Sequence, residues 1–279
     1  MIALIIISKN QVKYLPQMLL KLKAMSEQAD KIYYLTDRDS VADCKCAKKL
    51  IEESGLENLT YIQNETIPGY LGRPIMYYGE EHFLSGYCRN FCIDKAIADG
   101  CDQFVFIDGD CLPEGDIISG YKKYLTCDEA RLICGKRDES HFHYRDQREF
   151  NEYDNIFAEH LTPVTSEKAM LDSAVVWSCN IGMNLSAINR LRKINDTLYG
   201  KPEVFSSFFL GTWGGEDGFL GAECFYDSDI KIYGLGVGRT GITHIHHDRP
   251  LKKYGFNTFT YRLKTTIDMH RYLLENYTI

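Results

Sequence analysis

Hydrophobic and polar positions alternate between two periodicities over the first 110 residues, as they do where strands and helices follow one another. Four short apolar runs predict buried strands, at residues 2–7, 31–35, 59–62 and 104–107. Apolar positions three or four apart predict the helices between them, one with Leu15, Met18, Leu19 and Leu22 inward and two more at about 42–54 and 86–99. This alternation predicts right-handed βαβ units, a mostly parallel sheet and the α/β class.

The pattern becomes less regular beyond residue 110. Residues 136–173 are rich in charge, histidine and aromatic side chains, which predicts a loop-and-helix excursion over the sheet. The run Ala174–Trp177 predicts a further strand, and a helix is expected at about Leu185–Leu198. Gly234, Gly236 and Gly238 follow a late strand and open no evident helix, so this stretch is expected to be a loop.

Composition narrows the class of protein. A hydrophobic content of 44% and a charged content of 25% are ordinary for a globular chain and exclude wholesale disorder. The net charge of -7 argues against a broadly basic nucleic-acid surface but leaves room for a local patch. The apolar start Met1–Ile7 is too short for a membrane span and lacks a cationic leader and cleavage site. We therefore expect no membrane insertion and a cytoplasmic protein.

Cysteine and glycine spacing exclude several kinds of site. The ten cysteines are scattered and lack the paired CxxC spacing of a structural zinc site, which favours reduced and mostly buried thiols. Neither GxGxxG after the first strand nor GxxxxGK[ST] occurs, so dinucleotide-binding and P-loop sites are poorly supported.

Two carboxylates follow the strand at 104–107, in the sequence Asp108-Gly-Asp110. Side chains at i and i+2 just past a buried strand can meet at the sheet edge, where open α/β sheets bind ligands. Two close acids repel one another unless a cation lies between them, so the pair indicates a divalent metal site. The alternative is a solvated Asp-Gly-Asp turn.

The stretch Trp213-Gly-Gly-Glu216-Asp217 places two glycines and two acids beside one of the two tryptophans. Glycines let a ligand approach the backbone, a tryptophan can pack against a sugar ring, and a carboxylate there can take a proton from a hydroxyl. The alternative is a glycine turn followed by a helix with Glu216 and Asp217 at its start. The two interpretations are compatible, because a helix that begins beside a pocket would hold the two acids rigidly.

Three of the eight histidines lie within four positions, at His244, His246 and His247. A lone histidine is more often a structural residue than a ligand, but three at the end of an apolar strand favour a metal site. Together with Asp108 and Asp110 they indicate a mixed oxygen and nitrogen site suited to Mn²⁺ or a similar ion.

These motifs, in this order, resemble the GT-A glycosyltransferases, most closely the branch that contains the galactosyltransferases and polypeptide N-acetylgalactosaminyltransferases. Arg89-Asn90 is similar to an Arg-Asn pair of the related family-two transferases. The resemblance covers roughly residues 1–250 and implies a GT-A domain, with a nucleotide-binding half at 1–110 and an acceptor and catalytic half at 111–250. Residues 251–279 would add a basic and aromatic lid and a closing helix on the acceptor side.

The resemblance also implies a role for each matching residue. Asp110 would bind the metal, and Asp108 would bind the ribose or take part in the metal shell. His244 and His247 would complete the metal site, with His246 as the competing choice. Glu216 would contact sugar hydroxyls, and Asp217 would be the general base. The remaining donor-side residues are Asp37 for the base of a UDP-sugar, Arg89 for the diphosphate or the Asp-x-Asp loop, and Asn180, Trp213, Gly214 and Gly215.

The implied reaction is a direct displacement that inverts the anomeric centre of a UDP-sugar with help from Mn²⁺, or alternatively Mg²⁺. Gly218 and Phe219 stand where the family carries a further acid, and this departure bears on which acceptor is used.

The acceptor depends on the segment from Arg249 to Arg271, which is basic and aromatic in an otherwise acidic chain. It is either a closing helix with a lid that grips diphosphate, or a surface for a DNA acceptor with Lys252, Lys253 and Tyr254 as contacts. The latter would suit a phage enzyme that glycosylates a hydroxymethylated pyrimidine in the host cytoplasm. The alternatives are a bacterial transferase that builds a surface glycan, a non-catalytic nucleotide-sugar-binding module, and a metal-dependent nucleotidyltransferase.

Overall fold

The computed structural model describes most of the chain. The described residues are 1–37, 39–63, 75–77, 80–82, 85–138, 154–167, 176–206, 216–227, 229–236, 240–244 and 256–276. Within them, side chains are not described at 75–77, 80–82, 138, 154, 244, 256–263 and 265.

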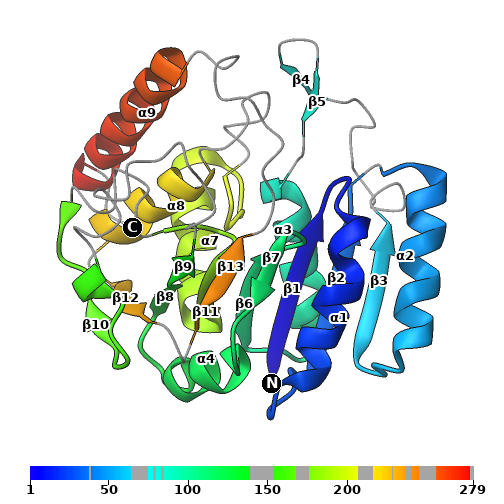
Figure 1. The fold of residues 1–279 in the computed structure, drawn as a ribbon. Helices are drawn as coiled ribbons and strands as arrows, with labels where there is room; N and C mark the ends of the chain where they lie inside the picture. The colour runs from blue at the N-terminus through cyan, green and yellow to red at the C-terminus, as the bar shows by residue number, and fades with distance from the viewer. Residues whose placement is uncertain are drawn as a thin grey trace.

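An eight-stranded sheet forms the centre of the molecule (Figure 1). Its strands are β1 (Ile2–Ser8), β2 (Lys31–Thr36), β3 (Leu59–Gln63), β6 (Gln103–Asp108), β8 (Arg131–Gly135), β10 (Thr162–Pro163), β11 (Asn180–Asn184) and β12 (Lys231–Leu235). Their order is β10-β12-β8-β11-β6-β1-β2-β3. The pairs of β1 with β2 and β6, of β2 with β3, and of β8 with β12 are parallel, whereas β11 runs antiparallel to both of its neighbours. The predicted α/β class with a mostly parallel sheet is confirmed.

Helices cover both faces of this sheet, which explains why its central strands read as unbroken apolar runs. On one face lie α1 (Leu15–Ala24), α2 (Val41–Ser54) and α4 (Ile117–Leu125). On the other lie α3 (Ser85–Ala98), α7 (Leu185–Tyr199) and α8 (Glu216–Tyr226). Strand β1 is buried along its whole length, and its successive side chains enter the two cores in turn.

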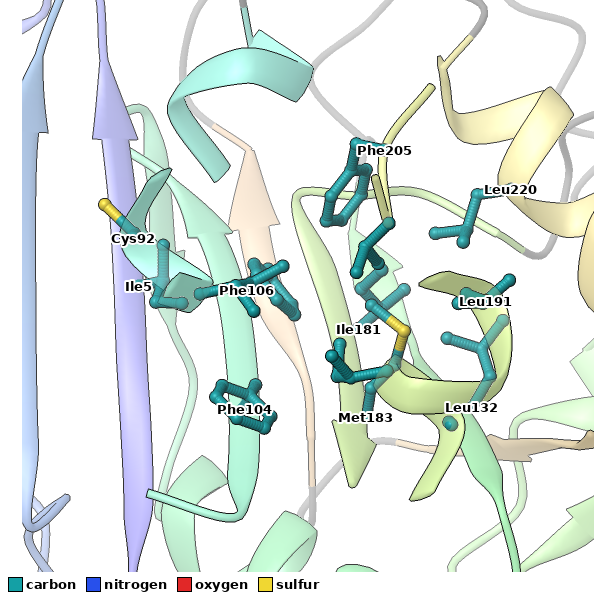
Figure 2. Close-up of a cluster of buried hydrophobic side chains, with 14 of the residues drawn as sticks. Ile5, Cys92, Phe104, Phe106, Leu132, Ile181, Met183, Leu191, Phe205 and Leu220 are labelled. Atoms are coloured by element: carbon teal, nitrogen blue, oxygen red, sulfur yellow. The ribbon is translucent and has the colours of Figure 1, made fainter. Parts of the chain in front are cut away.

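The core under α3, α7 and α8 reaches across the sheet from β1 to β8 (Figure 2). Phe106 of β6 meets the ring of Phe205 edge to face, with 5.3 Å between ring centroids. Leu191 of α7 and Leu220 of α8 close the same cluster. Burial of these side chains holds the start of α8 over the carboxyl end of β6.

Capping residues mark both ends of α2 and α7. The Ser40 hydroxyl accepts a hydrogen bond from the Asp43 amide at the start of α2, and Gly55 ends that helix with a φ of 70°. The Asn184 side chain caps α7 in the same way, and Gly200 ends it with a φ of 66°. The predicted helices at 42–54, 86–99 and 185–198 are therefore confirmed within a residue.

A second sheet, a hairpin and a C-terminal helix lie beside this central sheet. A three-stranded sheet has the order β7 (Cys111–Pro113), β13 (Ile242–His244) and β9 (Arg137–Asp138). A hairpin is formed by β4 (Ile75–Tyr77) and β5 (Glu80–His82). Helix α9 (Phe256–Asn276), red in Figure 1, packs against α8. The division into domains at residue 250 stays a prediction.

Two predictions about strands are wrong. Val176 and Trp177 are not in a strand, because the carbonyl of Trp177 accepts a hydrogen bond from the Asn180 amide in a turn, and β11 begins only at Asn180. Gly234 and Leu235 belong to β12 rather than to a loop. A Cβ on Gly234 would lie 2.3 Å from the carbonyl oxygen of Ile156, so this glycine serves close packing within a strand.

All ten cysteines are free, and eight of them are buried, which confirms the predicted reduced thiols. In the part of the chain that the structure describes, no helix combines the length and the apolar character needed to cross a membrane.

Candidate active site

A buried arginine joins three segments that are far apart in the sequence. Arg89, on α3, donates a hydrogen bond of 2.7 Å from Nη2 to Oδ1 of Asp108, at the end of β6. Its Nη1 lies 3.4 Å from Oε1 of Glu216, the first residue of α8. The hydroxyl of Ser85, at the start of α3, donates to the same Oε1. The predicted acids at 108 and 216 therefore meet at the carboxyl edge of the sheet.

The surroundings of Arg89 favour its charge. Its side chain is 1% exposed, and burial alone would lower its pKa. The negative charges of Asp108, Asp217 and Glu216 outweigh that effect and raise the pKa. The guanidinium also stacks on Phe205, with 5.3 Å from Cζ to the ring centroid. Arg89 thus holds the acids together as a fixed cation.

Asp217 has the properties that a general base needs. Its Oδ1 is buried and has no hydrogen-bond partner among the described residues. Burial, and then the charge of Glu216, raise the pKa of Asp217 to about 7, against the opposing effects of Arg89 and Ser178. A base that titrates near neutral pH can accept a proton without holding it permanently.

The Asp108-Gly-Asp110 corner is fixed by the end of β1. The Gly109 amide donates to the carbonyl of Ile7 over 2.8 Å, and a Cβ on Gly109 would lie 2.9 Å from the side chain of Ser8. Only glycine fits this turn without displacing its neighbours. The two acids of this corner differ in exposure: the side chain of Asp108 is 30% exposed, whereas Asp110 is 4% exposed.

The short strand β13 brings the histidine segment to this corner. In its antiparallel pairing with β7, residue 244 lies opposite Cys111, which directly follows Asp110. Two segments separated by more than a hundred positions therefore meet here, as predicted. The side chain of His244 lies outside the described residues. Among the side chains that are described, no three histidine, cysteine, aspartate or glutamate residues form a group able to hold a metal ion.

A second acidic corner lies at the end of β2. Asp37 is fully buried, and its amide donates to the carbonyl of Ser8 over 2.9 Å. Asp39 lies beside it and accepts a hydrogen bond of 3.1 Å from the Asn10 amide. Burial raises the pKa of Asp39 to about 6, and its Oδ2 has no hydrogen-bond partner within the described chain. Asp39 is therefore a second candidate, beside the predicted Asp37, for a contact to the base of a nucleotide.

The side chain of Asn180 makes hydrogen bonds within the fold through both of its polar atoms. Its Oδ1 accepts from the Tyr121 hydroxyl over 2.7 Å, and its Nδ2 donates to the carbonyls of Lys136 and Thr240. The residue is 1% exposed. These contacts tie β11 to α4 and to the segments after β8 and before β13, and donor binding by Asn180 stays a prediction.

The turn before β11 is a part of the site that sequence reasoning missed. Ser178 is 2% exposed, and the hydrogen bond of its side chain to Asp217 lowers the pKa of that acid. The sulfur of Cys179 accepts a hydrogen bond of 3.6 Å from Nη1 of Arg137. The Arg137 guanidinium carbon lies 3.1 Å from the centroid of the Trp177 ring. Ser85 was missed as well. None of these residues belongs to a motif, and only the tryptophan stands out by its rarity.

Several predicted site residues fall outside the part of the chain that the structure describes. They are Trp213, Gly214, Gly215, His246, His247, Lys252, Lys253 and Tyr254.

The fold resembles solved structures at low sequence identity. No protein-family model and no curated protein matches the chain. TarS from S. aureus, residues 1–349 in complex with UDP-GlcNAc, matches with a TM-score of 0.60 and 14% identity over 96% of this chain and 66% of that one. Another structure of S. aureus TarS matches with a TM-score of 0.58 and 14% identity, and this chain spans 39% of its length.

Two further structures have the same fold. One is the mannosyltransferase PcManGT from Pyrobaculum calidifontis with GDP-Man and Mn²⁺, at a TM-score of 0.53 and 10% identity over 97% of this chain and 62% of that one. The other is glucosyl-3-phosphoglycerate synthase from Mycobacterium tuberculosis with Mn²⁺, UDP and glucosyl-3-phosphoglycerate. It matches with a TM-score of 0.55 and 14% identity over 96% of this chain and 79% of that one. At these identities the likeness is one of fold, and that fold is the GT-A type.

Proposed function

We propose that this protein is a glycosyltransferase that moves a sugar from a UDP-sugar to an acceptor hydroxyl in a metal-dependent reaction with inversion. The observation that carries the proposal is the Arg89 cluster. It gathers Asp108, Glu216 and Asp217 at the carboxyl edge of a GT-A type sheet, where α/β proteins bind nucleotides. The neighbours support it, because proteins of this fold were solved with UDP-GlcNAc, with UDP and Mn²⁺, and with GDP-Man.

The described side chains by themselves contain no group of three that could hold an ion, so the proposed divalent cation, with Mn²⁺ favoured and Mg²⁺ as the alternative, would need ligands from the histidine segment as well. Four carboxylates lie at or next to this edge with one buried guanidinium, and Oδ1 of Asp217 lacks a donor among the described residues. Asp108 and Asp110 would hold the ion, with His244 and His247 as the further predicted ligands. When bound, the ion would offset the charge on the leaving diphosphate.

The chain's own residues would perform the remaining steps. Asp217 would accept the proton of the acceptor hydroxyl as its oxygen forms a bond to the anomeric carbon and the bond from that carbon to UDP breaks. Glu216 would hold a sugar hydroxyl, since Ser85 and Arg89 both donate to its Oε1 and fix its direction. Asp37 or Asp39 would read the base of the nucleotide.

The acceptor is proposed to be a hydroxymethylated pyrimidine in DNA, and a glycan is the alternative. Among the basic side chains described on α9, the exposed Lys264 would be one contact to phosphate. Arg271 does not, because it pairs with Glu275 at 3.0 Å and with Glu167 at 3.7 Å.

The test is a donor screen with detection of released nucleotide by mass. The full-length protein is incubated with Mn²⁺ and a panel of UDP-sugars and GDP-mannose, first alone and then with hydroxymethylated DNA, glycans and phosphoglyceric acid. We expect UDP as the product and one acceptor that gains the mass of the sugar. Transfer of UMP with release of sugar 1-phosphate would instead identify a nucleotidyltransferase. Binding without turnover across the panel would identify a nucleotide-sugar-binding module.

A further inference from the structure

Helix α3 holds both ends of the stretch that leads from α7 to α8. At the first end, Asn90 makes three hydrogen bonds to the backbone. Its Oδ1 accepts from the amides of Val204 at 3.1 Å and Phe205 at 2.9 Å, and its Nδ2 donates to the carbonyl of Phe205 over 2.8 Å. At the second end, Ser85 and Arg89 donate to Glu216.

The geometry of this double attachment is tight. Ser85 and Asn90 are separated by about 7.5 Å along the helix axis. The chain from Phe205 to Glu216 could span roughly 35 Å if extended, so its ends are fixed far closer together than its length requires. A Cβ on Gly86 would lie 3.2 Å from Cβ of Phe205 and 3.9 Å from Cβ of Glu216, so α3 approaches both ends directly.

Packing fixes the same attachment from below. Phe205 is fully buried, lies under the guanidinium of Arg89 and meets Phe106 of β6. The backbone that Asn90 holds is therefore also the backbone that places the ring beneath the cation. A shift of residues 204 and 205 would move the support of Arg89 and, through it, the direction of Glu216.

We propose that Asn90 and Ser85 are positioning residues for the reaction, which set Glu216 and Asp217 against the bound sugar by fixing the two ends of this stretch. The inference rests on the proposed function and deepens it. Neither residue is among those predicted to bind the nucleotide, and Asn90 bonds to the backbone of residues 204 and 205. Loss of either positioning residue should therefore lower turnover without weakening UDP binding.

The experiment compares two asparagines whose side chains each make several hydrogen bonds to the backbone. Asn184 also bonds to backbone, through the amide of Arg131 and the carbonyls of Cys127 and Glu129, but it lies opposite Gln103 at the far end of β6. Variants Asn90→Ala and Asn184→Ala are assayed as full-length proteins with Mn²⁺. The readouts are turnover per folded molecule, using the panel donor that releases UDP fastest, and the Kd for UDP by calorimetry.

We expect Asn90→Ala to lower kcat by about 10- to 100-fold, as misplaced catalytic groups do, with an unchanged Kd for UDP. Asn184→Ala should lose stability but keep kcat. Ser85→Ala removes the hydroxyl that donates to Glu216 and should also lower kcat. Ser85→Thr retains a hydroxyl and should have the kcat of the wild type.

Two results would overturn the positioning role. One is a kcat for Asn90→Ala and Ser85→Ala equal to that of Asn184→Ala, and the other is a fall in UDP affinity that parallels the fall in kcat. A wild-type protein that turns over no donor in the panel would overturn the proposed function itself, and these two failures are distinguishable.

Discussion

At the scale of single residues, the site depends on how one cation is shared among acids. Asp108 and Glu216 each bond to Arg89, whereas Asp217 interacts with it by charge and retains a buried oxygen without a donor in the described chain. A buried acid without a hydrogen bond to a cation is easier to protonate. The arrangement therefore separates holding residues from a proton-accepting residue.

This separation predicts different effects for two substitutions. Asp217→Asn should lower kcat by about 10²- to 10⁴-fold, the usual contribution of a general base, and leave UDP affinity intact. Asp110→Ala should weaken UDP binding when Mn²⁺ is present. Turnover and calorimetric titration with UDP check both. An equal loss of nucleotide affinity in the two variants would contradict the assigned roles.

The raised pKa of Asp217 also makes a prediction about stability. Its ordinary value is 3.8 and its value in the folded protein is about 7, so the folded state retains a proton that the unfolded chain has lost between these pH values. Its contribution to stability is present below about pH 4 and is lost as the pH rises through 7. Asp217→Asn cannot ionise, so it should match the wild type at pH 4 and melt at a higher temperature at pH 8. Melting curves from pH 4 to 8 test this, and parallel curves for the two proteins would refute it.

At the scale of elements, α9 depends on a buried histidine. His270 lies against Tyr199 of α7, with 2.6 Å from Nδ1 to the tyrosine hydroxyl, and edge-on to Phe219 of α8. Burial lowers the pKa of His270 to about 4, against the smaller opposing effect of Asp227. The helix is therefore packed around a neutral imidazole.

This contact predicts a loss of stability in acid. Below pH 6.5 the unfolded chain takes up a proton on this side chain that the folded protein excludes down to about pH 4, so stability falls as the pH falls through that window. His270→Gln should reduce the drop in melting temperature between pH 7 and pH 5. His160→Gln is the matched control, because His160 is exposed and should leave the drop unchanged. The same drop in both variants would exclude His270 as its origin.

The elements also show where local signals were sufficient. The helices with caps and 3.6-residue periodicity were predictable within a residue, since Ser40, Gly55 and Asn184 act on their own helix ends. Strand β11 was not, because the apolar run before it bends into a turn at Trp177 and the strand itself is chosen by pairing with β6 and β8. Pairing partners distant in sequence outweigh a short apolar run.

At the scale of the whole molecule, Arg89 joins α3, β6 and α8, and its loss should affect the entire fold. Arg89→Met removes the cation and leaves buried acids without a partner, which should lower the free energy of unfolding by about 3–5 kcal/mol. Arg192→Met is the control, because its partner Asp94 is 69% exposed and such pairs contribute about 0–1 kcal/mol. Urea unfolding at pH 7 measures both. Similar losses in the two variants would show that the cluster does not hold the fold together.

The sequence by itself determined the alternation of strands and helices over the first 110 residues, the acids that follow β6 and begin α8, and the glycine between Asp108 and Asp110, because these depend on residues close together in the chain. Only the tertiary structure decided which acids Arg89 holds, that Asp217 keeps a buried oxygen without a donor among the described residues, and that Ser85, Asn90 and Ser178 support them. The physical reason is that charge pairing and desolvation depend on distance in space. Here Arg89 and Glu216 are 127 positions apart in the chain, and Ser85 and Glu216 are 131 positions apart.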